Sequence, residues 1–217
     1  MASLKDLKSR ISSVNNTQKI TRAMKMVAAA KLRRAQEHAE AARPYAEAME
    51  GVLRTVRAHM EGSEALPTML VGTGRDRNYL IVAATADRGL CGGFNSNVAR
   101  DVRARIARWQ AEGKTVKLVC LGKKGHELLA TDHGESILTT FSGLYKTSPT
   151  YEHASEIATT LQRLMREHAV DRCLIVYNRF ETAMTQIVTC SQLMPLETPT
   201  QAGAPADMLT GGHTVPH

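Results

Sequence analysis

The chain has 217 residues, of which 43% are hydrophobic and 23% charged, and its formal net charge is +7. This length and apolar content allow one large or two small domains with a buried core, and they exclude a disordered polyelectrolyte. No run approaches the ~18 consecutive apolar residues of a membrane-spanning helix, and the charged start lacks the apolar run of a signal peptide. We therefore expect no direct membrane insertion and no export.

The positive charge is concentrated at the start of the chain. Residues 1–43 hold ten Lys and Arg residues against three acids, so this segment accounts for the whole net charge. A solvated helix face is the ordinary explanation for a charge run, but such a concentration favours an acidic partner. Nucleic acid is one candidate, although the segment has no aromatic residue for base stacking and no zinc-finger, RNP-type or zipper signature. We expect no nucleic acid partner.

Apolar residues recur three and four apart in the same region, which predicts a helix from about residue 4 to 60. From Leu32 to Met60 the spacing forms a heptad seam, and Pro44 is expected to kink the helix without ending it. Such a helix is roughly 85 Å long, longer than a compact domain of this size is wide. It must protrude, and its seam needs a partner helix or a protein sleeve.

The remaining chain predicts an α/β fold. Buried strands alternate with helices, which is typical of a three-layer domain around a mostly parallel sheet of five strands. The predicted strands are 79–85, 115–121, 136–141, 172–178 and 186–196, and the predicted helices are 95–111, a short one opening at 122–125, and 152–168. The predicted organisation is a helix over 1–61, a linker over 62–78, the α/β domain over 79–197 and a flexible tail over 198–217.

Neither the cysteines nor the glycine-rich turn predicts a chemical site. Four cysteines (Cys91, Cys120, Cys173, Cys190) form no CxxC pair and have no histidine at ligand spacing, so we expect reduced core residues and no metal. The turn Gly89–Gly93 lacks the GxGxxG spacing, and no GxxxxGK[ST] motif occurs. An enzyme binding a nucleotide at this turn stays an alternative, but we expect no cofactor and no catalytic residues.

Several motifs resemble one known family. The run Asn16–Gln36 (NTQKITRAMKMVAAAKLRRAQ) is similar to the N-terminal helix of the gamma subunit of F-type ATP synthase. Matching motifs follow at Arg43–Ala46 (RPYA), Asp87–Asn95 (DRGLCGGFN), Tyr177–Phe180 (YNRF) and Gln192–Leu196 (QLMPL). The resemblance extends from residue 1 to about 197, and the style of the sequence is alphaproteobacterial.

The resemblance implies a Rossmann-like α/β domain with a long N-terminal coiled-coil helix. It also implies a central-stalk rotor that couples proton-driven rotation to ATP synthesis at the beta subunits and has no catalytic site of its own. The implied partners are the alpha and beta subunits, the epsilon subunit and the membrane c-ring. The implied location is peripheral, on the cytoplasmic face of the bacterial inner membrane or the matrix side in a mitochondrion.

The resemblance also implies which residues contact the acidic loops of the beta subunits. They are Arg22, Met24, Lys25, Lys31, Arg33, Arg34, Arg88 and Cys91.

One departure from the family concerns residues 198–217, which contain nothing like the long C-terminal helix and its signature. The resemblance therefore implies a fragment, a truncated gene product or a divergent paralogue that does not rotate.

Overall fold

The computed structural model describes residues 3–59, 67–144, 149–182 and 185–196. The chain divides into two units, Met1–Thr55 and Val56–His217. The tail predicted over 198–217, and residues 62–66 of the predicted linker, lie outside the described residues.

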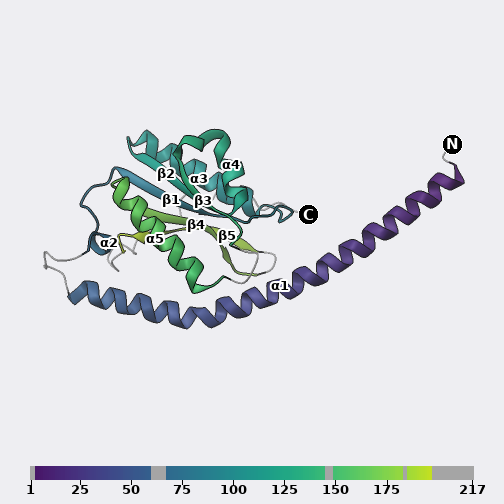
Figure 1. Ribbon diagram of the computed structural model, residues 1–217, viewed down its shortest axis with the longest axis horizontal. Helices are drawn as coiled ribbons and strands as arrows, with labels where there is room; N and C mark the ends of the chain where they lie inside the picture. The colour runs from purple at the N-terminus through teal and green to yellow at the C-terminus, as the bar shows by residue number, and fades with distance from the viewer. Residues whose placement is uncertain (1–2, 60–66, 145–148, 183–184, 197–217) are drawn as a thin grey trace. The chain divides into compact units, whose positions relative to one another are not determined.

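One helix, α1 (Leu4–His59), contains 56 residues and continues through Pro44, as the spacing predicts. Figure 1 draws it as a single, gently curved ribbon. Ser3 begins it: its hydroxyl accepts a hydrogen bond from Lys5 N at 3.2 Å, while Asp6 accepts one from Ser3 N at 3.2 Å. This reciprocal arrangement satisfies two backbone donors that a helix start leaves without partners.

The second unit is an α/β domain with a five-stranded sheet in the order β3-β2-β1-β4-β5. Strands β1 to β4 run parallel, and β5 is antiparallel to β4. Its elements are α2 (Thr68–Val71), β1 (Asn78–Ala84), α3 (Phe94–Ala111), β2 (Thr115–Leu121), α4 (Lys123–His133), η1 (Gly134–Ser136), β3 (Ile137–Phe141), α5 (Tyr151–Glu167), β4 (Arg172–Phe180) and β5 (Gln186–Met194). The expected mostly parallel sheet of five strands is confirmed. Helix α2 lies within the segment predicted as a linker.

Two cores cover the two faces of the sheet, because successive side chains of a strand point to opposite sides. On one face Ile81 packs with residues of α3 and α4, such as Ile106 and Leu129. On the other face Leu80 and Val82 pack with residues of α5. Figure 1 shows α3 and α4 together on one side of the strands and α5 on the other. The three layers predicted from the alternating elements are therefore present.

Polar side chains of the domain form hydrogen bonds at two edges of this sheet, where the carboxyl ends and the amino ends of the parallel strands lie. At the carboxyl edge lie the turn after β1, the start of α4 and the end of β4. At the amino edge, Asp171 precedes β4 and is only 3% exposed. Its carboxylate accepts hydrogen bonds from Arg77 N and Asn78 N at 3.0 Å each, and from the Thr73 hydroxyl at 2.5 Å. These bonds fix the segment that enters β1.

Candidate functional site

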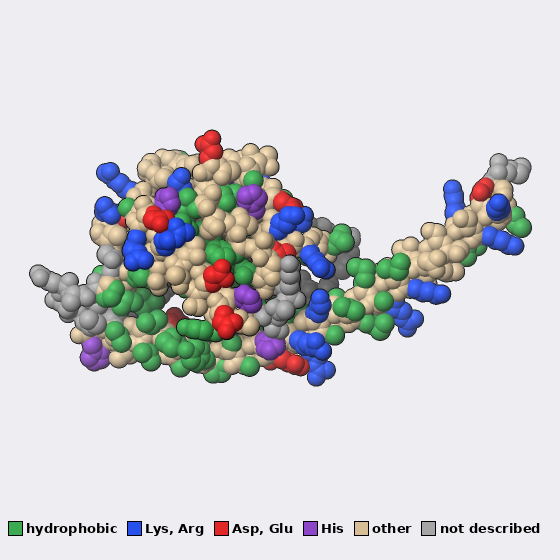
Figure 2. Space-filling model, viewed as in Figure 1, with side chains coloured by type: hydrophobic (Ala, Val, Ile, Leu, Met, Phe, Trp, Pro, Cys, Tyr) green, Lys and Arg blue, Asp and Glu red, His purple; other side chains and the backbone are tan. Residues whose placement is uncertain are grey.

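Six of the residues expected to bind a partner lie on α1, and all six are exposed. At about 100° per residue, Arg22, Lys25 and Arg33 point to one side of the helix, and Met24 and Lys31 to another. Figure 2 shows basic and hydrophobic side chains next to one another along the helix. The set therefore surrounds the helix instead of forming one patch. The sixth residue, Arg34, projects between these two sides.

The apolar seam of α1 is exposed together with this charge. Within the seam Leu32 is 37% exposed and Met49 42%, and before it Ile20 is 61% exposed, whereas a core position would be close to zero. The ion pairs of α1 that the structure shows in its described residues are local, such as Arg33 Nε to Glu37 Oε1 at 3.0 Å. Exposed pairs of this kind contribute ~0.5 kcal/mol or less. The helix thus offers a partner both apolar contact and positive charge.

The other two expected residues, Arg88 and Cys91, are brought together by the turn after β1. Asn95, in the first turn of α3, organises this turn. Its Oδ1 accepts from Ala86 N at 2.9 Å, and its Nδ2 lies 3.3 Å from Arg88 O and 3.1 Å from Cys91 Sγ. Asn95 is only 7% exposed, so these bonds are sheltered from water. The arrangement holds a protruding turn in a defined shape.

The apex of this turn is Leu90, a residue that sequence reasoning passed over. The residue is fully exposed, and its φ of 59° lies in the left-handed region that favours glycine. The sequence signal that could have identified Leu90 was an apolar residue between Arg88 and Cys91 in a glycine-rich turn. A leucine held in this way is a candidate contact residue.

The expectation that all four cysteines are core residues is wrong for Cys91, which is exposed because the turn carries it outward. Cys120 and Cys173 are buried as expected, and Cys190 is half-buried. Burial raises the pKa of the Cys120 thiol to about 11 and that of Cys173 to about 12. Both therefore stay protonated and unreactive at neutral pH.

The start of α4 is capped by the chain itself, so its backbone N–H groups are not free for a bound anion. Asp87 Oδ1 accepts from Lys123 N at 3.0 Å, at the first residue of α4, and Asp87 Oδ2 accepts from Gly143 N at 2.8 Å. The Thr85 hydroxyl accepts from Gly125 N at 2.8 Å. A carboxylate already neutralises this helix end, which argues against an anionic cofactor there.

The end of β4 is joined to the start of α3 in a similar way. Asn178 Nδ2, near the end of β4, donates to Phe94 O at 3.0 Å, at the first residue of α3. Within the described residues no cluster of three or more potential metal ligands occurs, and no helix there is long and apolar enough to cross a membrane. The carboxyl edge is therefore braced by hydrogen bonds between its loops, helices and strand ends.

Solved structures with a similar fold come from the rotating part of ATP synthases. A chain in the cryo-EM structure of the Tetrahymena thermophila mitochondrial ATP synthase central stalk and c-ring superposes with a TM-score of 0.63 at 24% identity, covering 81% of this chain and 72% of that one. A chain in the Euglena gracilis mitochondrial ATP synthase rotor gives 0.54 at 18% identity, covering 86% and 61%. This chain therefore shares its fold with these two chains.

Sequence comparison gives the family. The family model described as "ATP synthase" matches residues 3–213, beyond residue 197, where the resemblance was expected to stop. The chain is 48% identical to the ATP synthase gamma chain of Parvibaculum lavamentivorans over 96% of its own length and 71% of the relative's. It is 46% identical to that of Mesorhizobium japonicum, over 99% and 72%. This chain belongs to the ATP synthase gamma chain family.

Proposed function

We propose that the chain acts as the central-stalk rotor of a bacterial F-type ATP synthase, coupling proton-driven rotation to ATP synthesis at sites on the beta subunits. The observation that carries the proposal is α1, with 56 residues and both its apolar seam and its basic residues in solvent. A helix in a protein gains most of its stability when other protein covers its apolar positions, and here those positions are exposed. The alpha and beta subunits would supply that cover.

The proposed contacts with the acidic loops of the beta subunits are weak individually. They involve Arg22, Met24, Lys25, Lys31, Arg33 and Arg34 on α1, and Arg88 and Cys91 in the turn after β1. Exposed ion pairs contribute about 0.2–1 kcal/mol each and are screened by salt. Because the basic side chains surround the helix, weak contacts of this size can bias its angular position without locking it.

The chain would supply no catalytic group in this role. Its partners would be the alpha, beta and epsilon subunits and the c-ring, and it would sit peripherally at the cytoplasmic face of the inner membrane. The start of α4 supports this proposal, since Asp87 already accepts from the first backbone N–H of that helix and makes it less suited to an anionic ligand.

The test is reversal of charge on α1 in a reconstituted complex with alpha and beta subunits. We expect R33E/R34E to weaken co-purification with these subunits and lower coupled ATPase activity, while thermal unfolding of the α/β domain is unchanged. The matched control is R100E/R108E, which reverses two exposed charges on α3 of the α/β domain. Unchanged coupling with a fall of several degrees in melting temperature would assign Arg33 and Arg34 to folding and refute the proposed contact.

Binding assays with the chain alone address the other classes of function. Saturable nucleotide binding would favour an α/β enzyme. Salt-dependent binding to duplex DNA that disappears on removal of residues 1–43 would favour a nucleic acid partner. The rotor proposal expects neither result.

A further inference from the structure

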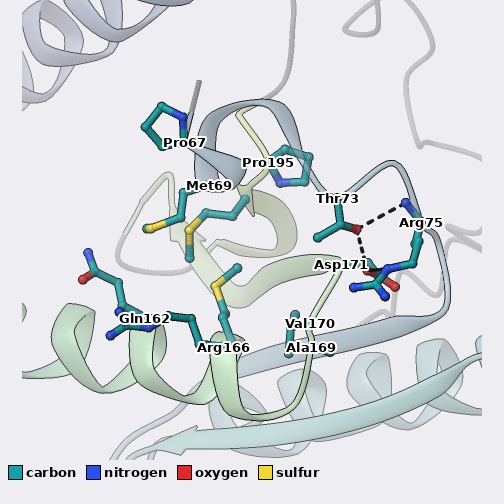
Figure 3. Close-up of a pocket in the computed structure, with 12 residues that line it drawn as sticks. Pro67, Met69, Thr73, Arg75, Gln162, Arg166, Ala169, Val170, Asp171 and Pro195 are labelled. Atoms are coloured by element: carbon teal, nitrogen blue, oxygen red, sulfur yellow. Dashed lines mark hydrogen bonds and ion pairs between the residues drawn. The ribbon is translucent and has the colours of Figure 1, made fainter. Parts of the chain in front are cut away.

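A cavity of about 400 Å³ lies at the amino edge of the sheet, on the side opposite the braced turn. It opens between the segment around α2, the end of α5 and the end of β5 (Figure 3). Its volume falls in the range of sites that hold a small molecule or a side-chain anchor. The expected contacts with the beta subunits do not use it.

The interior of this cavity is apolar and adaptable. Met69, Met165 and Met194 line it together with Val170. Figure 3 shows sulfur atoms between Gln162 and Arg166 on one side and Thr73 and Arg75 on the other. Methionine side chains are flexible and polarisable, so they fit apolar groups of varied shape and make favourable contacts with aromatic rings.

The rim of the cavity is basic. Arg75 Nε lies 3.4 Å from Asp171 Oδ1, so it is partly engaged. On α5, Arg163 pairs with Glu167 at 2.7 Å, but in the described part of the chain Arg166 has no such carboxylate partner. Gln162 lines the same side and can donate or accept a hydrogen bond.

The one acid of the lining, Asp171, is offset by Arg75, so Arg166 leaves the lining with a net positive charge. Both Asp171 oxygens are already used, by the Thr73 hydroxyl and by the backbone N–H groups of Arg77 and Asn78. The guanidinium of Arg166, next to the apolar interior of the cavity, therefore remains available to a ligand. Arginine binds carboxylates with two parallel hydrogen bonds where the approach is open.

The walls are held by the fold instead of being formed by chance side-chain positions. Gly72 has a φ of 87°, and a Cβ built there would lie 3.2 Å from Pro195 Cγ, so α2 packs closely on the end of β5. Asp171 fixes the segment from Thr73 to Asn78, which forms another wall. A cavity braced on two sides loses little freedom when it is filled, which favours binding.

We propose that this cavity is a docking site for a peptide segment of a protein partner that carries a large apolar side chain next to a carboxylate. The apolar side chain enters among the methionines, and the carboxylate pairs with Arg166. Charge complementarity carries this choice of partner, since the rim offers a positive charge and no acid with a free oxygen. The proposal concerns a surface separate from α1 and does not depend on the rotor function.

The experiment uses the full chain labelled with ¹³C at the methionine methyl groups, so that the cavity and α1 are observed separately. The probe is the peptide acetyl-Gly-Phe-Glu-Gly-amide, titrated alongside its Phe→Ala and Glu→Gln versions. We expect saturable shifts at Met69, Met165 and Met194 with the first peptide. We expect binding at least fivefold weaker with either changed peptide. Met24 and Met26 of α1 serve as internal controls and should not shift.

Protein variants test the role of the rim. R166Q should weaken binding of the peptide roughly fivefold, the effect of one charge-assisted contact at an open site. The matched control R163Q, one turn away on α5 and outside the cavity, should leave binding unchanged. A folded R166Q that binds equally well would overturn the assignment of the carboxylate.

Three further results would overturn the proposal as a whole. The first is the absence of shifts at the cavity methionines, and the second is equal shifts at Met24 and Met26. The third is tighter binding of free 3-phenylpropionate than of the peptide, which would assign the cavity to a small acid and not to a protein partner.

Discussion

Replacing Asn95 by alanine tests whether one side chain holds the turn that presents Leu90 and Cys91. The bond from Ala86 N, at 2.9 Å, is near ideal, and its loss leaves a partly buried donor unsatisfied, at a cost of about 1–2 kcal/mol. The bond to Arg88 O, at 3.3 Å, is longer and adds about 0.5 kcal/mol. We expect N95A to lose about 2 kcal/mol in total, or roughly 4–8 °C in melting temperature for a domain of this size.

The chain contains one tryptophan, Trp109, which is 8% exposed within the α/β domain, so its fluorescence during urea unfolding reports this unit and not α1. A thiol reagent provides a second reading, because Cys91 is exposed and should react faster once the turn loosens. The control is S96A, which removes an exposed bond to Gly93 O and should change stability by less than about 0.5 kcal/mol. A loss below that value in N95A, with unchanged reactivity of Cys91, would refute the role given to Asn95.

Three other perturbations follow from the same structure. Gly122 has a φ of 99°, and a Cβ there would lie 2.3 Å from a backbone oxygen, so G122A should cost about 3 kcal/mol or more by thermal unfolding. G113A, also left-handed but with nothing within 4 Å of its Cβ, should cost about 1 kcal/mol, and equal losses would contradict the close-contact argument. Burial by itself raises the pKa of Asp171, but the hydrogen bonds to its carboxylate outweigh this effect and hold the pKa below its ordinary value. The contribution of Asp171 to stability is therefore present above about pH 4 and is lost as the pH falls further. Urea unfolding should therefore show D171N less stable than the parent at pH 6, with the difference shrinking below pH 4; a constant difference would exclude this linkage. Finally, hydrogen exchange in α1 should be fast in a proven monomer, and strong protection over residues 5–40 would show that its exposed seam needs no partner.

The sequence was sufficient for the elements and layers of the α/β domain because these depend on local pattern. The apolar run 79–85 reads as a buried strand, and the structure has β1 at Asn78–Ala84 with Leu80 and Ile81 fully buried. The unbroken helix through Pro44 was also predictable from the phase of the seam. The role of a residue can be inferred in this way when it is local or when it recurs along one element.

The remaining features depend on contacts between distant parts of the chain. Asp171 bonds to backbone groups more than 90 positions earlier in the sequence, and Asp87 bridges α4 and the loop after β3. No periodicity indicates such pairs. The exposure of Cys91 was missed for a related reason: a small residue in a glycine-rich turn reads as core until the turn is seen to project. The cavity likewise combines three segments that only the fold brings together.

The bonds across the carboxyl edge have a mechanical consequence. Asp87 joins the end of β1 to α4 and to the loop after β3, and Asn178 joins the end of β4 to α3. A sideways load applied at the protruding turn is therefore shared among these five segments instead of bending one of them. Sliding one strand past its neighbour would require breaking several of these bonds at once, which gives the edge high shear stiffness. A force applied at Leu90 would therefore act on several elements of the domain together.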